Sequence, residues 1–414
     1  MGPISRAATG HAIQLVNRCE PIGSWLLRDS VAFDEDAIVT AAQKRAGLTD
    51  FGDASFRDGL RELLKSCETE AQLSFIGRLS AREYLVSLLT NLLYMERDRQ
   101  VDSGIGAEKI RAPIFMLGLP RTGSTMLHAL LAQDAGHRVP LTWEVMFPSA
   151  GRSGHEADST RVRCCSRNLK WFHRMAPNFK PIHAVGAELP QECIAITPHV
   201  MQSILFHTMY NVPSYQDWLD RNGYREAYRF HRKFLMHLQH ARGSGRWLLK
   251  APGHLFSLTD LIAEYPDAVF IQTHRAPARV IGSISSHAVV LRNAFSEVVD
   301  ERAAAEDWVR LWDGALADAL TVRSDAQNKF VDVMYQDLEA NPMQVVRSIY
   351  DAIGAELTPE TEAKMERHLL RNPKGHNGVH RYAVPEIDPE SKNGSKSFWM
   401  YQRKFNIPEE STTD

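Results

Sequence analysis

The sequence has little cysteine, no long apolar run and almost no net charge. Its five cysteines include no CxxC pair and are odd in number, which argues against a disulfide framework. They are Cys19, Cys67, Cys164, Cys165 and Cys193. No apolar run approaches the roughly 18 residues that a membrane-spanning helix needs, and the first residues lack the pattern of a secretion signal. These absences predict a cytoplasmic protein with reduced thiols and no integral membrane association.

The charges are nearly balanced, with 48 Lys and Arg against 50 Asp and Glu and a formal net charge of −2. A balanced chain lacks the general attraction to polyanions that nucleic-acid binding requires, although a local basic pocket for a small anion remains compatible with it. His231, His237 and His240 lie in one helix-like stretch without carboxylates at metal-ligand spacing. We therefore expect no nucleic-acid partner and no metal site.

The first part of the chain, residues 1–110, has apolar residues at helical spacing, for example Leu60, Leu63 and Leu64. Ser80 followed by Glu83 is typical of a capping box and predicts the start of a second helix there. These patterns predict an N-terminal helical extension.

Four short apolar runs follow, each succeeded by a helix-like stretch. They are Ile114–Leu117, Trp247–Leu249, Val269–Ile271 and Phe330–Val333. Strands that alternate with helices predict an α/β fold whose central parallel sheet carries helices on both faces. We expect one domain over residues 111–385 with a long helical insertion at 140–245, and a C-terminal tail at 386–414. The chain from residue 371 onward is rich in Gly, Asn, Lys and Pro and is expected to be irregular.

The segment Gly118-Leu-Pro-Arg-Thr-Gly-Ser-Thr125 lies between an expected strand and an expected helix. Its spacing is that of a phosphate-binding loop, whose backbone N–H groups and following helix N-terminus attract an anion. Ser124 stands where the lysine of nucleoside-triphosphate loops belongs, and the cation is Arg121 inside the loop. The loop therefore favours a phosphate-containing ligand other than ATP. The residues expected to contact it are Arg121, Thr122, Gly123, Ser124 and Thr125.

A second polar stretch, His274-Arg-Ala-Pro-Ala-Arg-Val-Ile-Gly-Ser283, follows another expected strand. An arginine at the carboxyl end of a strand and a serine in the next helix can bind one phosphate together. Arg275 and Ser283 are therefore the candidates for a second anion site at the same edge of the sheet.

Together these stretches resemble the sulfotransferases that use 3′-phosphoadenosine 5′-phosphosulfate. In that family a segment like Pro120–Thr125 holds the 5′-phosphosulfate, and an arginine with a serine eight residues later, as in Arg275 and Ser283, binds the 3′-phosphate. The resemblance implies a P-loop-like sulfotransferase fold. It is most similar to bacterial sulfotransferases, with features of the protein-tyrosine type.

Two later segments extend the resemblance. Tyr335 stands where the family has a tyrosine near the adenine. Lys374 and Gly375 resemble a late element that closes over the 3′-phosphate, although Pro373 replaces the arginine that normally precedes it. The resemblance implies a cofactor role for Tyr335, Lys374 and Gly375.

Transfer of a sulfuryl group depends on positioning and on cations at the departing phosphate oxygen, for which Arg121 and Lys250 are the candidates. Lys250 ends a strand where the family has a catalytic lysine. The acceptor also needs a general base. Resemblance points to Glu144, as in the protein-tyrosine enzymes, or to His254, as in the cytosolic ones, and it favours Glu144 slightly. Glu188 and Glu192 are a third possibility.

The predicted reaction passes the sulfuryl group to a hydroxyl, less readily an amine, of a small molecule. The insertion at 140–245 is left for the acceptor pocket, because the cofactor motifs occupy the sheet edge. One alternative is an ATP-dependent small-molecule kinase, which the missing loop lysine opposes. Another is a catalytically degenerate member that serves as an interaction module.

Overall fold

The computed structural model describes residues 31–179, 185–243, 245–373 and 396–410. The chain divides into two compact units. Unit 1 comprises residues 1–109, 140–242 and 288–300, and unit 2 comprises residues 110–139, 243–287 and 301–414. The N-terminal helices and the helices of the insertion thus belong to the same unit. In the described part of the chain, no helix is both long and apolar enough to span a bilayer.

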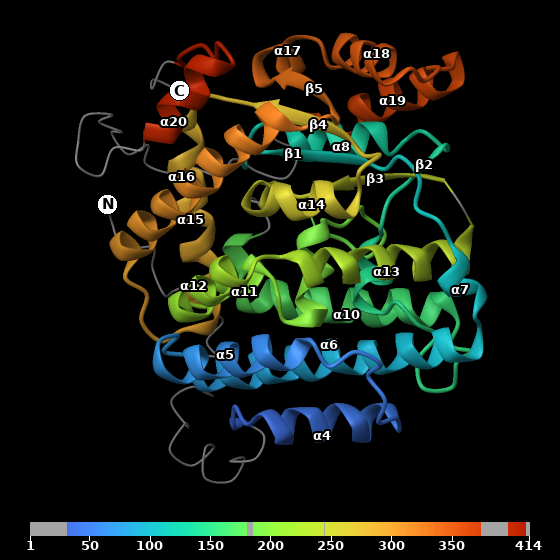
Figure 1. Ribbon diagram of the computed structural model, residues 1–414, viewed down its shortest axis with the longest axis vertical. Coiled ribbons are helices and arrows are strands. Elements are labelled where there is room, and N and C mark those ends of the chain that lie inside the picture. The colour runs from blue at the N-terminus through green and yellow to red at the C-terminus, as the bar shows by residue number, and fades with distance from the viewer. Residues whose placement is uncertain (1–30, 180–184, 244, 374–395, 411–414) are drawn as a thin grey trace. The chain divides into compact units, whose positions relative to one another are not determined.

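Unit 2 is built on a five-stranded parallel sheet in the order β2-β3-β1-β4-β5 (Figure 1). The strands are β1 (Ile114–Gly118), β2 (His137–Arg138), β3 (Arg246–Lys250), β4 (Val269–His274) and β5 (Lys329–Met334). The four apolar runs therefore form strands, and the expected α/β fold with a parallel sheet is confirmed. The edge strand β2 was not expected, because its two residues are polar and show no apolar run.

The helices of unit 2 lie on both faces of this sheet (Figure 1). They are α8 (Ser124–Leu131), the 3-10 helix η5 (Pro252–Ser257), α14 (Leu258–Glu264), α16 (Glu301–Asp325), α17 (Tyr335–Ala340), α18 (Pro342–Ile353), α19 (Pro359–Arg371) and α20 (Lys396–Lys404). Successive side chains of β1 point to opposite faces. Ile114 and Met116 belong to the core that includes α8, α18 and α19. Phe115 packs instead against Tyr265 and Phe270.

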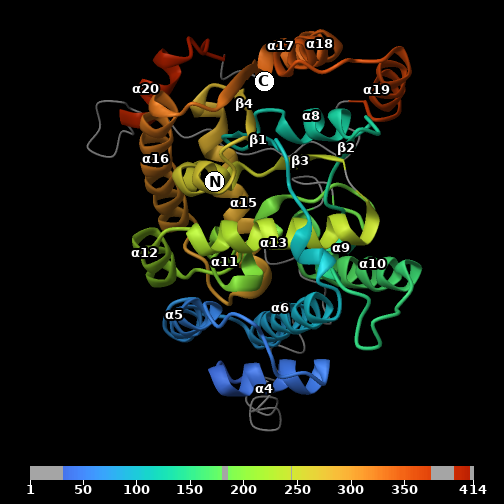
Figure 2. The same cartoon turned by 45° about the vertical axis from the view of Figure 1, so that its right-hand side comes forward.

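Helix α20 corrects the expectation of an irregular C-terminal tail. It packs along α16, where the Ser397 N–H donates to Asp313 and the Lys404 Nζ donates to Ser324 Oγ at 2.8 Å (Figure 2). Buried Phe398 and Tyr401 supply its apolar side. The helix is short and follows a long Gly- and Asn-rich stretch, so composition alone concealed it.

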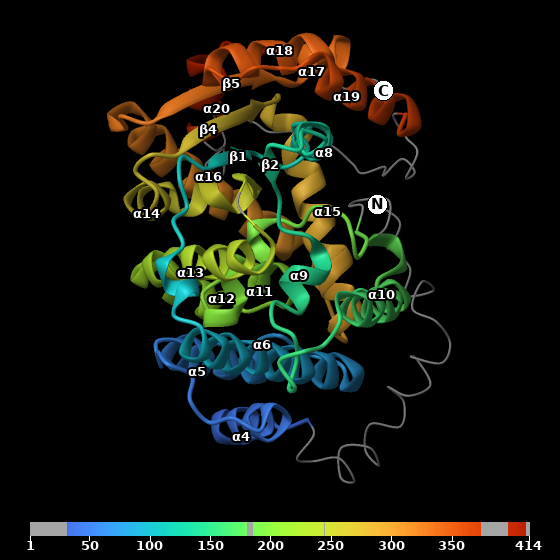
Figure 3. The ribbon, with the colours of Figure 1, turned by 90° about the vertical axis from the view of Figure 1, so that its right-hand side faces the viewer.

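Unit 1 is helical. Its helices are α4 (Glu35–Ala46), α5 (Phe56–Thr69), α6 (Phe75–Val101), α7 (Gly104–Ala107), α9 (Thr142–Met146), α10 (Asp158–Met175), η2 (Pro177–Phe179), η3 (Cys193–Ala195), η4 (Thr197–Val200), α11 (Ile204–Met209), α12 (Pro213–Asn222) and α13 (Arg225–Arg242). Helix α4 packs on α6 (Figure 3). Helix α15 (Pro277–Phe295) begins in unit 2 and ends in unit 1.

The predicted capping box at Ser80 is wrong. Helix α6 begins six residues earlier, where the Ser74 hydroxyl accepts a hydrogen bond from the Gly77 N–H at 3.1 Å. Glu83 instead pairs with Arg45 of α4 at 2.7 Å. Serine is favoured at helix N-caps, so Ser74 and Ser80 are both compatible with a helix start. Phe75 and Gly77 are buried, so tertiary packing favours the start at Ser74.

Candidate active site

The loop between β1 and α8 is held in a conformation that few residues adopt. Gly118 and Gly123 have φ angles of 137° and 82°, and Arg121 has a φ of 67°. A non-glycine residue in the left-handed region costs about 1–2 kcal/mol, and such strain is concentrated at functional sites. The loop thus turns sharply around Arg121, whose side chain is exposed at the start of α8.

Hydroxyl groups brace this loop from within. Buried Thr122 donates to the Leu119 carbonyl at 2.7 Å, and its Oγ1 lies 2.5 Å from Thr273 Oγ1 at the end of β4. Thr125 accepts a hydrogen bond from Lys250 Nζ at 3.0 Å. Lys250 is only 3 % exposed, so a buried ammonium group lies at the first turn of α8. The N-terminus of α8 and this ammonium both favour an anion at the loop.

The sheet topology explains why distant residues meet here. β1 is the central strand, with β3 on one side and β4 on the other. In the register of the strands Gly118 is opposite Thr273, and Met116 is opposite Lys250. The carboxyl ends of the three strands therefore bring the loop, Lys250 and Arg275 to one edge of the sheet.

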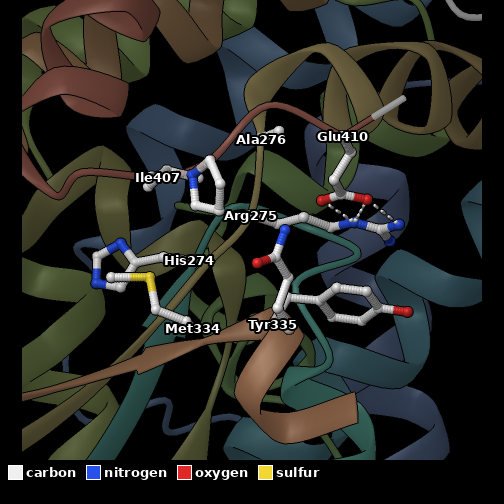
Figure 4. Close-up of a pocket in the computed structure, with 9 residues that line it drawn as sticks. His274, Arg275, Ala276, Met334, Tyr335, Ile407 and Glu410 are labelled. Atoms are coloured by element: carbon white, nitrogen blue, oxygen red, sulfur yellow. Dashed lines mark hydrogen bonds and ion pairs between the residues drawn. The ribbon is translucent and has the colours of Figure 1, made fainter. Parts of the chain in front are cut away.

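Arg275 makes specific contacts directly beside the loop. Its Nη1 donates to the carbonyl of Arg121 at 3.1 Å, and its guanidinium carbon lies 3.9 Å from the ring centre of Tyr335. Its Nε donates to Glu410 Oε1 at 3.0 Å, and its Nη2 donates to Glu410 Oε2 at 2.8 Å (Figure 4). A Cβ at Gly123 would lie 2.7 Å from Leu338 Cδ2 and 3.3 Å from the Tyr335 ring, so this glycine allows the loop to pack closely on α17.

A small pocket lies at this point of unit 2. It is lined by His274, Arg275, Met334, Tyr335, Ile407 and Glu410, among others (Figure 4). Tyr335 and Arg275, both expected at a cofactor site, are thus brought together. Ser283 lies in α15, but its side chain is outside the described part of the structure, and Lys374 and Gly375 are outside the described residues altogether.

The candidate bases are divided between the two units. His254 lies in η5 of unit 2, is 3 % exposed, and packs edge-on against Phe115. Glu144 lies in α9 of unit 1 and is 2 % exposed. Its Oε2 accepts from the Leu141 N–H at 2.9 Å, and its Oε1 is 3.3 Å from Arg242 Nε. Glu144 therefore caps its own helix and forms an ion pair with the partly exposed Arg242.

Glu188 and Glu192 also lie in unit 1, on a segment next to α9. The N–H groups of Thr142 and Trp143 donate to the carbonyls of Leu189 and Ala187. These hydrogen bonds place Glu144 and the segment of Glu188 and Glu192 in the same part of unit 1.

Two residues at the pocket were missed by sequence reasoning. Both ring nitrogens of His274 form hydrogen bonds. Nε2 bonds to Asp332 Oδ1 at 2.7 Å, and Nδ1 bonds to the Tyr401 hydroxyl at 2.9 Å. Burial lowers the pKa of His274, and the hydrogen bond with Asp332 offsets this only in part. Burial raises the pKa of Asp332, but hydrogen bonds from His274 and Arg323 outweigh it and hold that pKa well below its usual value.

The second missed residue is Glu410. Its partner Arg275 lies 135 positions away in the sequence, and no local pattern connects them. For His274 a signal existed, since a titratable side chain ends the strand directly before Arg275.

Comparison with known proteins decides the family. Residues 113–359 match the model of the sulfotransferase family, which covers more than half of the chain. The chain belongs to the sulfotransferase family.

Individual sulfotransferases agree with this assignment. The solved structure of sulfotransferase STF1 from Mycobacterium tuberculosis is 30 % identical, covers 80 % of this chain and 92 % of its own, and has a TM-score of 0.72. Sulfotransferase STF9 from Mycobacterium avium, 22 % identical over 90 % of this chain and 97 % of its own, has a TM-score of 0.77 and shows the same fold.

A curated relative is Omega-hydroxy-beta-dihydromenaquinone-9 sulfotransferase Stf3 of Mycobacterium bovis. It is 26 % identical over an alignment of 261 residues that covers 58 % of this chain. The match spans 62 % of the length of that relative. The expected resemblance to bacterial sulfotransferases is therefore confirmed.

Within the described residues of this family member, no group of three His, Cys, Asp or Glu side chains is arranged to hold a metal ion. The site is instead cationic, with Arg121, Lys250, Arg275 and Arg279 at one sheet edge. This donor set fits an anionic ligand with two separate charged groups, because one cation pair lies at α8 and the other at the end of β4.

Proposed function

We propose that this member of the sulfotransferase family transfers a sulfuryl group from 3′-phosphoadenosine 5′-phosphosulfate to a hydroxyl of a small molecule. The observation that carries the proposal is the meeting of the strained Arg121 loop with Arg275 and Tyr335 at one sheet edge. The family match favours sulfuryl transfer over the kinase alternative.

In this proposal the loop residues Arg121 to Thr125 bind the 5′ end of the donor, and Arg275 with Ser283 binds the 3′-phosphate. Tyr335 forms one wall of the nucleotide site. Bound there, the donor supplies the activated sulfuryl group. Arg121 and Lys250 stabilise the negative charge that develops on the departing phosphate oxygen. Lys250 is already held in place by its burial and by its hydrogen bond to Thr125. Lys374 and Gly375 are proposed to add a late contact to the 3′-phosphate.

We propose His254 as the general base. It lies in the same unit as the loop, four residues after Lys250, and its ring packs edge-on against Phe115. Glu144 is supported as a base by resemblance alone, and its two carboxylate oxygens already serve Leu141 and Arg242. His254→Asn should remove the acidic limb of the pH dependence of kcat/KM, whereas Glu144→Gln should retain it. The opposite pattern would transfer the role to Glu144.

The acceptor is proposed to be a hydroxylated small molecule. One relative is named for an omega-hydroxy menaquinone, which supports a hydroxyl over an amine. The helical insertion at 140–245 is proposed to contribute the acceptor pocket.

Calorimetric titration with adenosine 3′,5′-bisphosphate tests the proposed donor. We expect binding by the intact chain, and failure to bind with the fold intact would favour the interaction module instead. Arg275→Ala should weaken binding of the bisphosphate about 30-fold, the loss expected for charge-assisted hydrogen bonds, and should leave adenosine 5′-monophosphate nearly unaffected. Equal losses for both nucleotides would contradict the role of Arg275.

A further inference from the structure

The carboxylate of Glu410 covers one edge of the Arg275 guanidinium. Its two oxygens accept from Nε at 3.0 and 3.1 Å, and Oε2 also accepts from Nη2 at 2.8 Å. Arg279 Nε lies 3.9 Å from the same Oε2. The side chains of Glu410 and Arg275 are each only 16 % exposed, so water screens this pair less than a surface ion pair.

A carboxylate presents arginine with the same two-oxygen edge that a phosphate does. The Nε–Nη2 edge of Arg275 is taken by Glu410, and Nη1 donates to the Arg121 carbonyl. A phosphate on Arg275 would bring a second anion to the place that the Glu410 carboxylate occupies. The two groups therefore compete for the same guanidinium.

The segment that carries Glu410 is anchored before it reaches Arg275. In α20 the Tyr401 hydroxyl bonds to His274 Nδ1 at 2.9 Å, and the ring of Phe405 lies 4.3 Å from the His274 ring. Beyond it Ile407 is buried, whereas Pro408 and Glu409 are exposed. Glu410 thus lies on a short arm, separated from the buried Ile407 by two exposed residues.

We propose that Glu410 is an internal substitute for the 3′-phosphate of the donor. Its carboxylate neutralises and orients Arg275 before the nucleotide binds, is displaced when the 3′-phosphate arrives, and returns when the bisphosphate product leaves. The proposal rests on the proposed function, because it requires Arg275 to bind that phosphate. Its consequence is weaker product retention, since Glu410 competes only with ligands that carry a 3′-phosphate.

The full chain with Glu410→Gln tests this proposal, and Glu409→Gln is the matched control because its side chain is exposed one residue away. Calorimetry with adenosine 3′,5′-bisphosphate should show a Kd about tenfold lower for Glu410→Gln and within twofold of wild type for Glu409→Gln. Adenosine 5′-monophosphate should bind all three proteins equally. An unchanged or higher Kd of Glu410→Gln for the bisphosphate would overturn the proposal.

Hydrogen exchange provides a readout that is independent of affinity. The amides of Glu409 and Glu410 should exchange faster when the bisphosphate binds to wild type, and should already exchange fast in ligand-free Glu410→Gln. Slower exchange on binding would show that the arm closes over the nucleotide, which contradicts displacement. If wild type binds no bisphosphate, the proposed function fails as well; if it binds and Glu410→Gln gains nothing, only the displacement proposal fails.

Discussion

The two stretches of unit 2 that are proposed to bind the anionic ends of the donor are built in different ways. The loop after β1 takes its shape from its own backbone, with two glycines and Arg121 at positive φ and with Thr122 bonded to a carbonyl three residues earlier. The stretch after β4 depends on one side chain, Arg275, whose partners Tyr335 and Glu410 come from β5–α17 and from the C-terminal segment. A local motif can therefore specify the first stretch, whereas the second needs the completed fold.

The largest expected effect comes from substituting Arg121 in the first stretch, where two variants distinguish the role of its charge from that of its backbone strain. Arg121→Ala should lower the transfer rate about 100- to 1000-fold, as expected when a group that stabilises the transition state is lost. Arg121→Gly should lose the same activity but raise the free energy of unfolding by about 1 kcal/mol relative to Arg121→Ala, because glycine tolerates the positive φ. Steady-state kinetics and urea unfolding measure both quantities.

Turnover like that of wild type in Arg121→Ala would contradict the role of the loop cation. Equal stability of the Ala and Gly variants would show that the φ of 67° carries no strain.

Gly118→Ala should have the next largest effect. A Cβ at this position would lie 2.4 Å from the Thr273 carbonyl oxygen, and the φ of 137° disfavours any side chain. We expect the free energy of unfolding to fall by about 2–3 kcal/mol, from the clash and the backbone strain together. The control is Gly314→Ala in α16, where a Cβ meets nothing within 4 Å and should be neutral or stabilising. Similar urea midpoints for the two variants would remove the argument that this loop is locally constrained.

The smallest expected effect concerns His274, at the end of β4 next to the second stretch. The pKa of His274 is lower in the folded chain than its ordinary value of 6.5, so the unfolded chain binds the proton more readily. The stability that this histidine contributes is therefore present above pH 6.5 and is lost as the pH falls through the folded pKa. His274→Asn should reduce the loss of unfolding free energy between pH 7.5 and 5.5 by about 1 kcal/mol or less.

His155→Asn, at an exposed position, is the control for that series. If His274→Asn leaves the pH dependence unchanged, the network with Asp332 and Tyr401 does not depend on a neutral imidazole.

Four of the five strands could be predicted from the sequence, because each contains an apolar run next to glycine or polar residues. It found the loop of Arg121 for the same reason, since the motif is contained in eight consecutive residues. It missed β2, which consists of His137 and Arg138, and it placed the α6 cap at Ser80 instead of Ser74. Both errors arise where tertiary packing, and not local composition, selects the residue.

The site was predicted unevenly for the same physical reason. Arg275 and Tyr335 follow strands and could be found from position and resemblance, but the sequence contains no sign that Glu410 pairs with Arg275 or that Tyr401 pairs with His274. Such pairs follow from the packing of α20 on α16, which only the folded chain establishes.

The hydrogen bond from Arg275 to the Arg121 carbonyl has a consequence for how a two-headed ligand is recognised. The groups proposed for the two anionic ends touch each other, so once one end of a linked ligand is bound, its other end is held beside its own partner. The free energies of binding of two half-molecules will consequently not sum to that of the whole. The intact nucleotide binds this edge of the sheet through two anionic groups at once, as a chelator does. The covalent connection between those groups therefore contributes to its affinity.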